Sequence, residues 1–406
     1  MSRTRAIAWR LALLILISGA FSTVGWAQER TPAAGGEEVT VKGALQCAGM
    51  VIPDPKPEDH NYMVIFAVDG SPGIASRVKK IMDEFYPDKG LDADAAVKLQ
   101  DQFNAQLKFY IAPDSPAKPP GQNTGKGHYC SSARASAVTG ILYEKDGRKW
   151  IRASRIEDTR LNYPEKMLAP DRPFAMPDKK PLILQVGKNL SLTCIKVPAG
   201  RAMLGAPFYM AYRYQEEYPR PVTLTRPFYL SEIPITQDVW EAVMGNNPST
   251  VKNPSMPVQS PPFAEIDRFC QMLSEKTGRK VRLPSAAEWE YAARAGTSNP
   301  GFPEKYRDQN SAGNEGWKSV LPVKSRKPNA WGFYDMFSCW WEVTGDRAMY
   351  PTRHPEVDPR YPASGRGNRA AMGVVKENWS VSIREFEDEK GLGYTSNKFR
   401  ILVEAD

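Results

Sequence analysis

The stretch RLPSAAEWEYAARAG, residues 282–296, carries the strongest local structural signal in the chain. Ser285 and Glu288 have the spacing of a capping box, in which each side chain accepts a hydrogen bond from the other residue's backbone amide at a helix N-terminus. Trp289 and the alanines after it form one apolar face, and Gly296 stands where the helix would end. The sequence therefore predicts a short, firmly fixed helix here.

Two further helices are predicted upstream of this stretch. The first begins at Thr236 as a candidate cap and ends at Gly245. The second ends at Gly278, and its apolar residues follow the i, i+3, i+4, i+7 spacing of a buried helical face: Ile266, Phe269, Cys270 and Leu273. Cys270 is accordingly interpreted as a core residue.

The composition is that of a globular, loop-rich protein. The 406 residues are 41% hydrophobic, carry a formal net charge of +8 and include 35 prolines, so two domains are expected. Only three histidines are present, which argues against metal catalysis by several imidazoles. Acids are interspersed among the basic residues without a basic tract, so no nucleic-acid partner is expected.

The first 27 residues have the features of an export signal. Arg3, Arg5 and Arg10 precede an uncharged run, 11–26, and small residues lead to a cleavage position after Ala27. The alternative is a retained membrane anchor, but the run has 16 residues, and a spanning helix needs about 20. We therefore expect an exported protein, periplasmic or extracellular, without a stable membrane span after cleavage.

Residues 37–160 are predicted to form a small α+β domain. Strand-like segments at 39–47 and 61–68 are followed by two helical stripes, and the second stripe runs from Ala96 to Tyr110. Two β-rich runs flank Asp146 and Gly147, a pair suited to a tight hairpin turn. A barrel in the manner of the oligonucleotide/oligosaccharide-binding fold is one arrangement that fits this order. Residues 161–181, rich in proline, are interpreted as a linker.

The five cysteines leave the redox chemistry open. They are Cys47, Cys130, Cys194, Cys270 and Cys339, and in an exported chain the odd count leaves at least one outside any intramolecular disulfide. Cys47 and Cys130 both belong to the first half. They either form a disulfide, or serve as a redox or metal pair, or are plain structural residues.

Three motifs, at 228–249 (FYLSEIPITQDVWEAVMGNNPS), 282–296 and 327–346 (KPNAWGFYDMFSCWWEVTGD), occur in this order. Together they resemble the formylglycine-generating enzyme family, also called sulfatase-modifying factors. The resemblance runs from about residue 190 to 403, with weaker motifs near Arg366 and Arg400. It implies an irregular α/β domain related to the C-type lectin fold, here assigned to residues 182–406, with structural calcium in many members. The fold class predicted for the whole chain is α+β.

The cysteine pair of that family is missing. Family members oxidise a sulfatase cysteine to formylglycine with oxygen, using two cysteines between the counterparts of Arg366 and Phe399 that bind copper(I) and accept the substrate thiol. This chain has no cysteine after Cys339. Met372 is a soft ligand, but a thioether cannot form the mixed disulfide. We therefore expect neither copper nor the family's oxidation chemistry.

The calcium site that the resemblance implies is altered. Glu342 matches the acidic ligand and Asn310 roughly matches an upstream asparagine, whereas Ser338 and Cys339 replace the family's glycine and asparagine. A thiol is a poor ligand for a hard cation. Glu342 is therefore either a calcium ligand or a buried carboxylate paired with an arginine such as Arg400.

Three functional hypotheses remain: one assigns the principal function to the N-terminal domain through Cys47 and Cys130, and two concern the C-terminal domain. In the first of these two, the chain is a pseudoenzyme, a binding or structural module whose partner is a protein, peptide or glycan of the cell envelope. Its candidate binding surface comprises Trp379, Arg384, Tyr394 and Arg400. In the alternative, it is a formylglycine-generating oxidoreductase with a non-standard residue set, for which Cys339 is the one late thiol.

Overall fold

The computed structural model describes residues 36–51, 62–85, 93–118, 133–161, 180–210, 217–296, 321–336, 341–347, 351, 354–362, 369–373, 383–387 and 398–405. The chain divides into two units, Met1–Glu37 and Glu38–Asp406, and the described residues belong almost entirely to the second. The predicted signal, residues 1–27, and most of the predicted linker, residues 161–181, lie outside them. Among the described helices, none combines the length and the apolar character needed to cross a bilayer.

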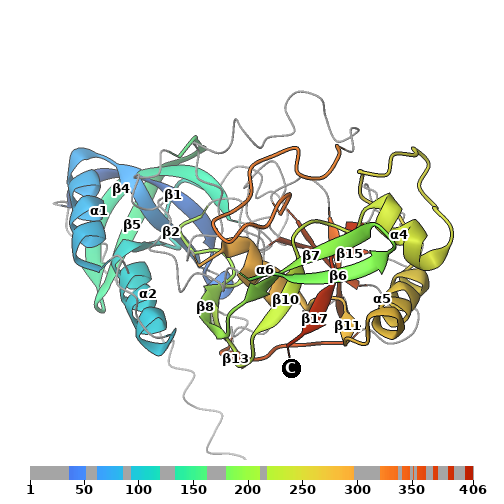
Figure 1. The fold of residues 1–406 in the computed structure, drawn as a ribbon. Coiled ribbons are helices and arrows are strands. Elements are labelled where there is room, and N and C mark those ends of the chain that lie inside the picture. Colours follow the sequence, from blue (N-terminus) through green and yellow to red (C-terminus); the bar gives the residue numbers. More distant parts are fainter. Residues whose placement is uncertain are drawn as a thin grey trace, which may run out of the picture. The chain divides into compact units, whose positions relative to one another are not determined.

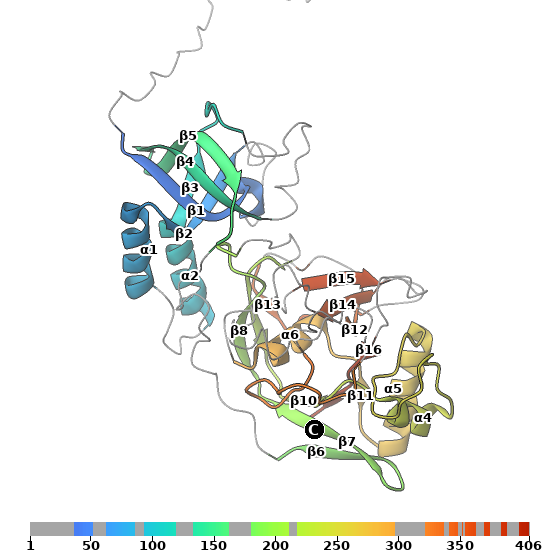
Figure 2. The same cartoon turned by 90° about the horizontal axis from the view of Figure 1, so that it is seen from above.

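The first part of the chain forms a closed five-stranded barrel (Figure 2). Its strands are β1 (Glu38–Cys47), β2 (Met63–Gly70), β3 (Lys108–Ile111), β4 (Arg134–Lys145) and β5 (Arg148–Asp158). The order is β1–β2–β3–β5–β4, and β4 pairs with β1 to close the barrel. Only the β3–β5 contact is parallel among these pairs. Closure removes the exposed edges that an open sheet would leave.

Local sequence explains two features of the barrel. At Gly43, beside a register shift in β1, a Cβ atom would lie 1.9 Å from the Phe66 carbonyl oxygen, so only glycine allows the strands to approach. Asp146 and Gly147 have φ of 52° and 69° and connect β4 to β5. The predicted hairpin is therefore confirmed, with the left-handed turn expected from these residues.

Three helical segments stand between β1 and β3: η1 (Ala48–Met50), α1 (Pro72–Phe85) and α2 (Ala93–Leu107). Helices α1 and α2 pack against each other and against β2. The helical stripe predicted to end at Tyr110 is wrong at its end, because α2 stops at Leu107 and Tyr110 belongs to β3. The spacing of Leu107 and Tyr110 fits a helix, and no glycine or proline marks the change.

The rest of the chain contains three sheets. Their strands are β6 (Leu182–Gly187), β7 (Leu190–Val197), β8 (Gly200–Leu204), β9 (Arg220–Leu224), β10 (Phe228–Ser231), β11 (Val281–Arg282), β12 (Glu342–Arg347), β13 (Glu356–Val357), β14 (Arg369–Gly373), β15 (Ile383–Glu387), β16 (Lys398–Phe399) and β17 (Leu402–Glu404). The sheet orders are β11–β17–β10–β7–β6, β15–β14–β12–β16 and β13–β9–β8. The α+β class is thus confirmed, with a high content of sheet.

All three helices predicted in this part are present: α4 (Gln237–Met244), α5 (Phe263–Thr277) and α6 (Ala286–Arg294). Helices α4 and α5 pack against the five-stranded sheet (Figure 1). Gly245 and Gly278 end α4 and α5 with φ of 75° and 67°, as predicted. Thr236 is the N-cap residue of α4, but its side chain makes no capping hydrogen bond; it contacts the Asp238 carboxylate instead.

Aromatic packing joins these helices to the C-terminal strands. The Trp240 and Phe269 rings stack at 5.2 Å between centroids, and Phe399 meets both edge-on. The predicted core faces of α4 and α5, including Cys270, are buried. Phe208, which follows β8, belongs to the hydrophobic cluster of the barrel. Its backbone carbonyl accepts a hydrogen bond at 2.9 Å from the Gln46 side chain of β1.

Candidate functional site

The candidate site is built around the buried carboxylate of Glu342, at the start of β12. Its side chain is 1% exposed. Oε2 accepts hydrogen bonds from Trp289 Nε1 at 2.7 Å and from Arg400 Nε at 2.9 Å, and Oε1 lies 3.6 Å from Lys398 Nζ. Lys398 arrives there because β16 pairs with β12 in parallel, with Glu342 and Lys398 as register partners. We call these four residues the Glu342 cluster.

The capping box of α6 positions the tryptophan of this cluster. Ser285 Oγ accepts from the Glu288 amide at 3.2 Å, and Glu288 Oε2 accepts from the Ser285 amide at 2.7 Å. The helix is thereby fixed at its first turn, and Trp289 is buried one residue later. The predicted capping box is confirmed, whereas the hydrogen bond from Trp289 to Glu342 was not predicted.

Arg400 connects the cluster to the backbone. Nη1 donates to the Ser231 and Glu232 carbonyls at 3.2 and 2.8 Å, and Nη2 donates to the Tyr334 carbonyl. The side chain is fully buried. Its placement on the candidate binding surface is therefore corrected: Arg400 lies in the interior, where its planar group satisfies three carbonyls and one carboxylate.

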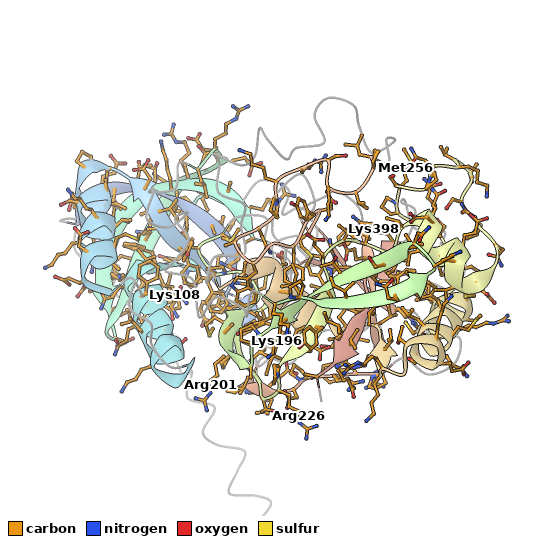
Figure 3. All side chains as sticks on the ribbon, in the orientation of Figure 1. Lys108, Lys196, Arg201, Arg226, Met256 and Lys398 are labelled. Atoms are coloured by element: carbon orange, nitrogen blue, oxygen red, sulfur yellow. The ribbon has the colours of Figure 1, made fainter. Side chains whose placement is uncertain are left out.

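Lys398, labelled in Figure 3, brings a second positive charge to Glu342. Burial lowers the pKa of Lys398 because the interior disfavours the ammonium. The charges of Glu342 and Asp335 act in the opposite direction, and Arg400 adds to the lowering. The carboxylate of Glu342 is thus the shared counterion of two buried cations.

The described neighbours of Glu342 do not fit a calcium ion. Calcium takes six to eight oxygen ligands, but Glu342 faces an indole N–H, a guanidinium and an ammonium. The described residues include no group of three or more His, Cys, Asp or Glu side chains that could hold a metal. Of the two interpretations of Glu342, the geometry shows the pairing with Arg400. Asn310 lies outside the described residues.

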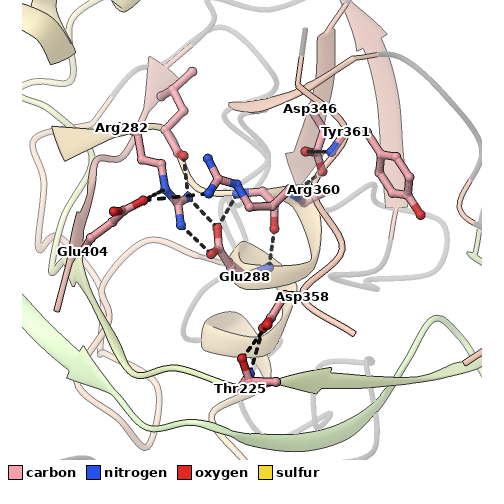
Figure 4. A network of polar contacts seen from close by, with 11 residues as sticks. Thr225, Arg282, Glu288, Asp346, Asp358, Arg360, Tyr361 and Glu404 are labelled. Atoms are coloured by element: carbon pink, nitrogen blue, oxygen red, sulfur yellow. Dashed lines mark hydrogen bonds and ion pairs between the residues drawn. The ribbon is translucent and has the colours of Figure 1, made fainter. Parts of the chain in front are cut away.

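A second ionic network holds α6 to the C-terminal strands (Figure 4). Arg282 binds both oxygens of Glu288, at 2.8 and 2.7 Å, and reaches Glu404 at 3.1 Å. Burial opposes the charge of Arg282, but the hydrogen bonds and charges of Glu288 and Glu404 outweigh it and raise its pKa. Asp346 of β12 accepts from the Ala286 amide at 2.9 Å. Side chains of two strands, Arg282 of β11 and Asp346 of β12, therefore hold the first turn of α6.

The described thiols of the C-terminal part are unsuited to redox chemistry. Burial raises the pKa of both Cys194 and Cys270 to about 12. The thiolate is the reactive form, so both groups are chemically inert at neutral pH. Cys47 is also buried. Cys130 and Cys339 lie outside the described residues, and the pairing of Cys47 with Cys130 stays a prediction.

Of the predicted binding surface, the described residues include Arg384 and Arg400. Trp379 and Tyr394 lie outside the described residues. Arg384 belongs to β15, where its register partner is Met372 of β14, and only its backbone is described. Met372 itself is fully buried in a hydrophobic cluster. The sequence suggested the pair of Glu342 and Arg400 but not the contacts of Trp289 and Lys398 with the same carboxylate. Lys398 arrives there through the pairing of β12 with β16, two strands far apart in the sequence.

Residues 181–373 match the family model described as a sulfatase-modifying factor enzyme 1-like domain. The chain therefore carries a domain of the formylglycine-generating enzyme, or sulfatase-modifying factor, family. The recognition made from the three sequence motifs is confirmed.

Individual relatives are distant. The formylglycine-generating enzyme of Bos taurus is 25% identical over 151 residues, covering 33% of this chain and 39% of that protein. The chaperone protein LppX of Paenibacillus barcinonensis is 26% identical, covering 29% and 63%. The solved structure of Treponema denticola variable protein 1 is 23% identical with a TM-score of 0.48, covering 55% of this chain and 99% of that one. The chain spans only about two-fifths of the bovine enzyme's length.

Proposed function

We propose that this protein is an exported binding or structural module whose sulfatase-modifying factor domain has lost the family's oxidase chemistry. The single observation that carries the proposal is the absence of any cysteine after Cys339. A copper(I) centre and a mixed disulfide with substrate both need thiolates. The family domain matched at 181–373 supplies the scaffold.

The interior of the domain supports this proposal. The Glu342 cluster joins α6, β12 and β16 through two hydrogen bonds to Glu342 Oε2 and an ion pair between Lys398 and Oε1. Cys194 and Cys270, the described thiols of this domain, are buried and have raised pKa values. Such an interior stabilises a frame, on which exposed loops vary in sequence and bind partners.

Four finer assignments belong to the same proposal. The domain is related to the C-type lectin fold, and the five-stranded barrel is related to the oligonucleotide/oligosaccharide-binding fold. Export places the partner, a protein, peptide or glycan, in the cell envelope. The calcium that the family resemblance implies would bind away from Glu342, whose oxygens face cations and an N–H donor.

The similarity to a protein named as a chaperone supports a role in binding. The matched part of LppX is 26% identical to this chain, and a chaperone acts by contact with another protein. The candidate surface of Trp379, Arg384 and Tyr394 is where we propose such a contact.

The test is an oxidation assay on the purified chain. The protein is incubated with copper(I), oxygen and a peptide carrying a sulfatase cysteine motif, and mass spectrometry follows conversion of cysteine to formylglycine. A formylglycine-generating enzyme that keeps both cysteines is the positive control, and a peptide with serine in place of cysteine is the negative control. No product from a protein shown to be folded is the expected result.

Product formation would overturn the proposal in favour of an oxidoreductase with a non-standard residue set. Cys339→Ser is then the decisive variant, because Cys339 is the last thiol in the chain. Loss of product in that variant would assign the chemistry to Cys339.

A further inference from the structure

The parallel pair β3–β5 of the barrel presents aromatic and basic side chains on one face. In β3, Phe109 and Ile111 are buried, whereas Lys108 and Tyr110 are half-buried on the opposite face. This is the alternation expected of a strand with one face in the core. In β5, Trp150 is the register partner of Tyr110, so the two rings lie side by side.

The rings form a continuous row. Tyr110 and Trp150 have centroids 5.0 Å apart with 35° between their planes. Tyr62, which immediately precedes β2, meets Trp150 edge-on at 6.3 Å and is 38% exposed. The row thus reaches from the outer face of β3 to the start of β2 and ends in a ring that is open to solvent.

Two cations flank this row. Lys108 Nζ lies 5.2 Å and Arg148 Cζ 5.1 Å from the centroid of the Tyr110 ring, within the range of cation–π attraction. Among the described residues, neither cation forms an ion pair with a carboxylate. Arg152, two residues beyond Trp150, is already paired with Asp114 at 3.3 Å. The positive charge free to meet a ligand is therefore that of Lys108 and Arg148.

Neighbouring groups show how much positive charge gathers at this end of the barrel. Lys149 lies over the Phe109 ring at 4.7 Å. Burial and the charges of Arg77 and Lys108 lower the pKa of Lys149 to about 8, although Glu144 acts against them. Asp101 is close enough for Lys108 to lower its pKa, but burial outweighs this and raises it. An anionic ligand would relieve the repulsion between the cations.

We propose that the surface formed by Tyr62, Lys108, Tyr110, Arg148 and Trp150, the aromatic–cationic platform, binds an acidic polysaccharide. The rings of Tyr62 and Trp150 offer apolar faces to the C–H groups of sugar rings, and the two cations that lie over Tyr110 meet carboxylates along the same chain. This assignment goes beyond the proposed function, which concerns the other domain.

The charge density favours a glycan over a nucleic acid. Single strands carry a phosphate at every nucleotide, and their proteins line the path with many cations. Within the described part of the chain, the platform offers two cations without a carboxylate ion pair, and the charge of Lys108 also acts on Asp101. The predicted export of the chain also places it among glycans.

The test measures binding of short oligogalacturonates to the purified full chain by calorimetry at low salt. The methyl-esterified oligomer, which lacks the negative charges, and single-stranded oligothymidylate are the comparison ligands. The variants are Arg148→Gln and Trp150→Leu. Arg155→Gln is the matched control, because it removes the same charge from the same strand at an arginine whose side chain is 64% exposed and outside the platform. Thermal unfolding confirms that each variant is folded.

Arg148→Gln is expected to weaken oligogalacturonate binding about three- to fivefold, and Trp150→Leu about tenfold. Arg155→Gln is expected to change it less than about twofold. Failure to bind oligogalacturonate, equal binding of the methyl ester, or an equal loss in Arg155→Gln would each overturn the proposal. Tighter binding of oligothymidylate would reassign the platform to nucleic acid and equally overturn it. If Trp150→Leu fails to fold, Arg148→Gln against Arg155→Gln decides alone, since both side chains lie on the surface.

Discussion

Replacing Arg400 with methionine should destabilise the C-terminal domain more than replacing Lys398, the other cation of the Glu342 cluster. The guanidinium binds Glu342 at 2.9 Å and satisfies the carbonyls of Ser231, Glu232 and Tyr334. Arg400→Met leaves these acceptors without their donor in a site with no exposed surface. Removing one partner of a buried ion pair costs about 3–5 kcal/mol of the free energy of unfolding.

Lys398→Met is the matched control. This variant removes the ammonium of Lys398, whose Nζ lies 3.6 Å from Glu342 Oε1. The side chains of Lys398 and Glu342 are both almost fully buried. Arg400 still pairs with Glu342 in this variant, and desolvation of the lysine, which already lowers its pKa, is relieved. The loss in Lys398→Met should therefore be about 1 kcal/mol or less.

Urea unfolding followed by tryptophan fluorescence measures the difference. With an m-value of about 2–3 kcal/mol/M, Arg400→Met should lower the midpoint of unfolding by about 1–2.5 M. Lys398→Met should shift it by less than about 0.5 M. Equal shifts of the urea midpoint in the two variants would refute the reasoning. They would show that the carbonyl contacts of Arg400 and its shorter distance to Glu342 add nothing to the stability of the domain.

Three further predictions concern other groups. Ser285→Ala removes the capping box and should cost about 1 kcal/mol in urea unfolding; an unchanged midpoint would contradict the cap's role. Burial raises the pKa values of Cys194 and Cys270 to about 12, so both thiols should resist iodoacetamide at pH 8 in the folded protein and react in urea. Peptide mass spectrometry measures the labelling, and rapid labelling of the folded protein would refute their burial. The pKa of Lys149 falls from 10.5 to about 8 on folding, chiefly through burial. Between these two pKa values the unfolded chain binds more protons than the folded chain, so the stability of the wild type should rise with pH. The melting temperature of the wild type should therefore increase relative to that of Lys149→Met as pH rises from 8 to 10. A difference in melting temperature that stays constant over this range would argue against the pKa shift.

Local signals in the sequence predicted the helices and one hairpin. Gly245 and Gly278 end α4 and α5 as expected, and the capping box at Ser285 begins α6. These signals succeed because each depends on residues within one or two turns of the chain. The turn at Asp146 is predictable for the same reason, since its left-handed backbone is set by two residues.

Apart from the pair of Glu342 and Arg400, contacts between distant segments were the part that the sequence did not reveal. Lys398 reaches Glu342 only because β16 lies parallel to β12, and no local pattern states that pairing. Tyr110 fits a helical spacing as well as a strand, and its assignment depends on hydrogen bonds to β2 and β5. The aromatic–cationic platform is likewise assembled from three separated segments, so composition alone gave no hint of it.

The position of β17 between β10 and β11 has a consequence for biosynthesis. Ser231 Oγ accepts a hydrogen bond from the Ile401 amide, 170 positions later, and Leu230 pairs with Leu402. A ribosome that adds about 5–20 residues per second needs about 10–30 s to cover that interval. Throughout this time the nascent β10 has an open edge that can pair with a neighbouring chain. Efficient maturation should therefore depend on holding factors that cover this edge until the last strands emerge.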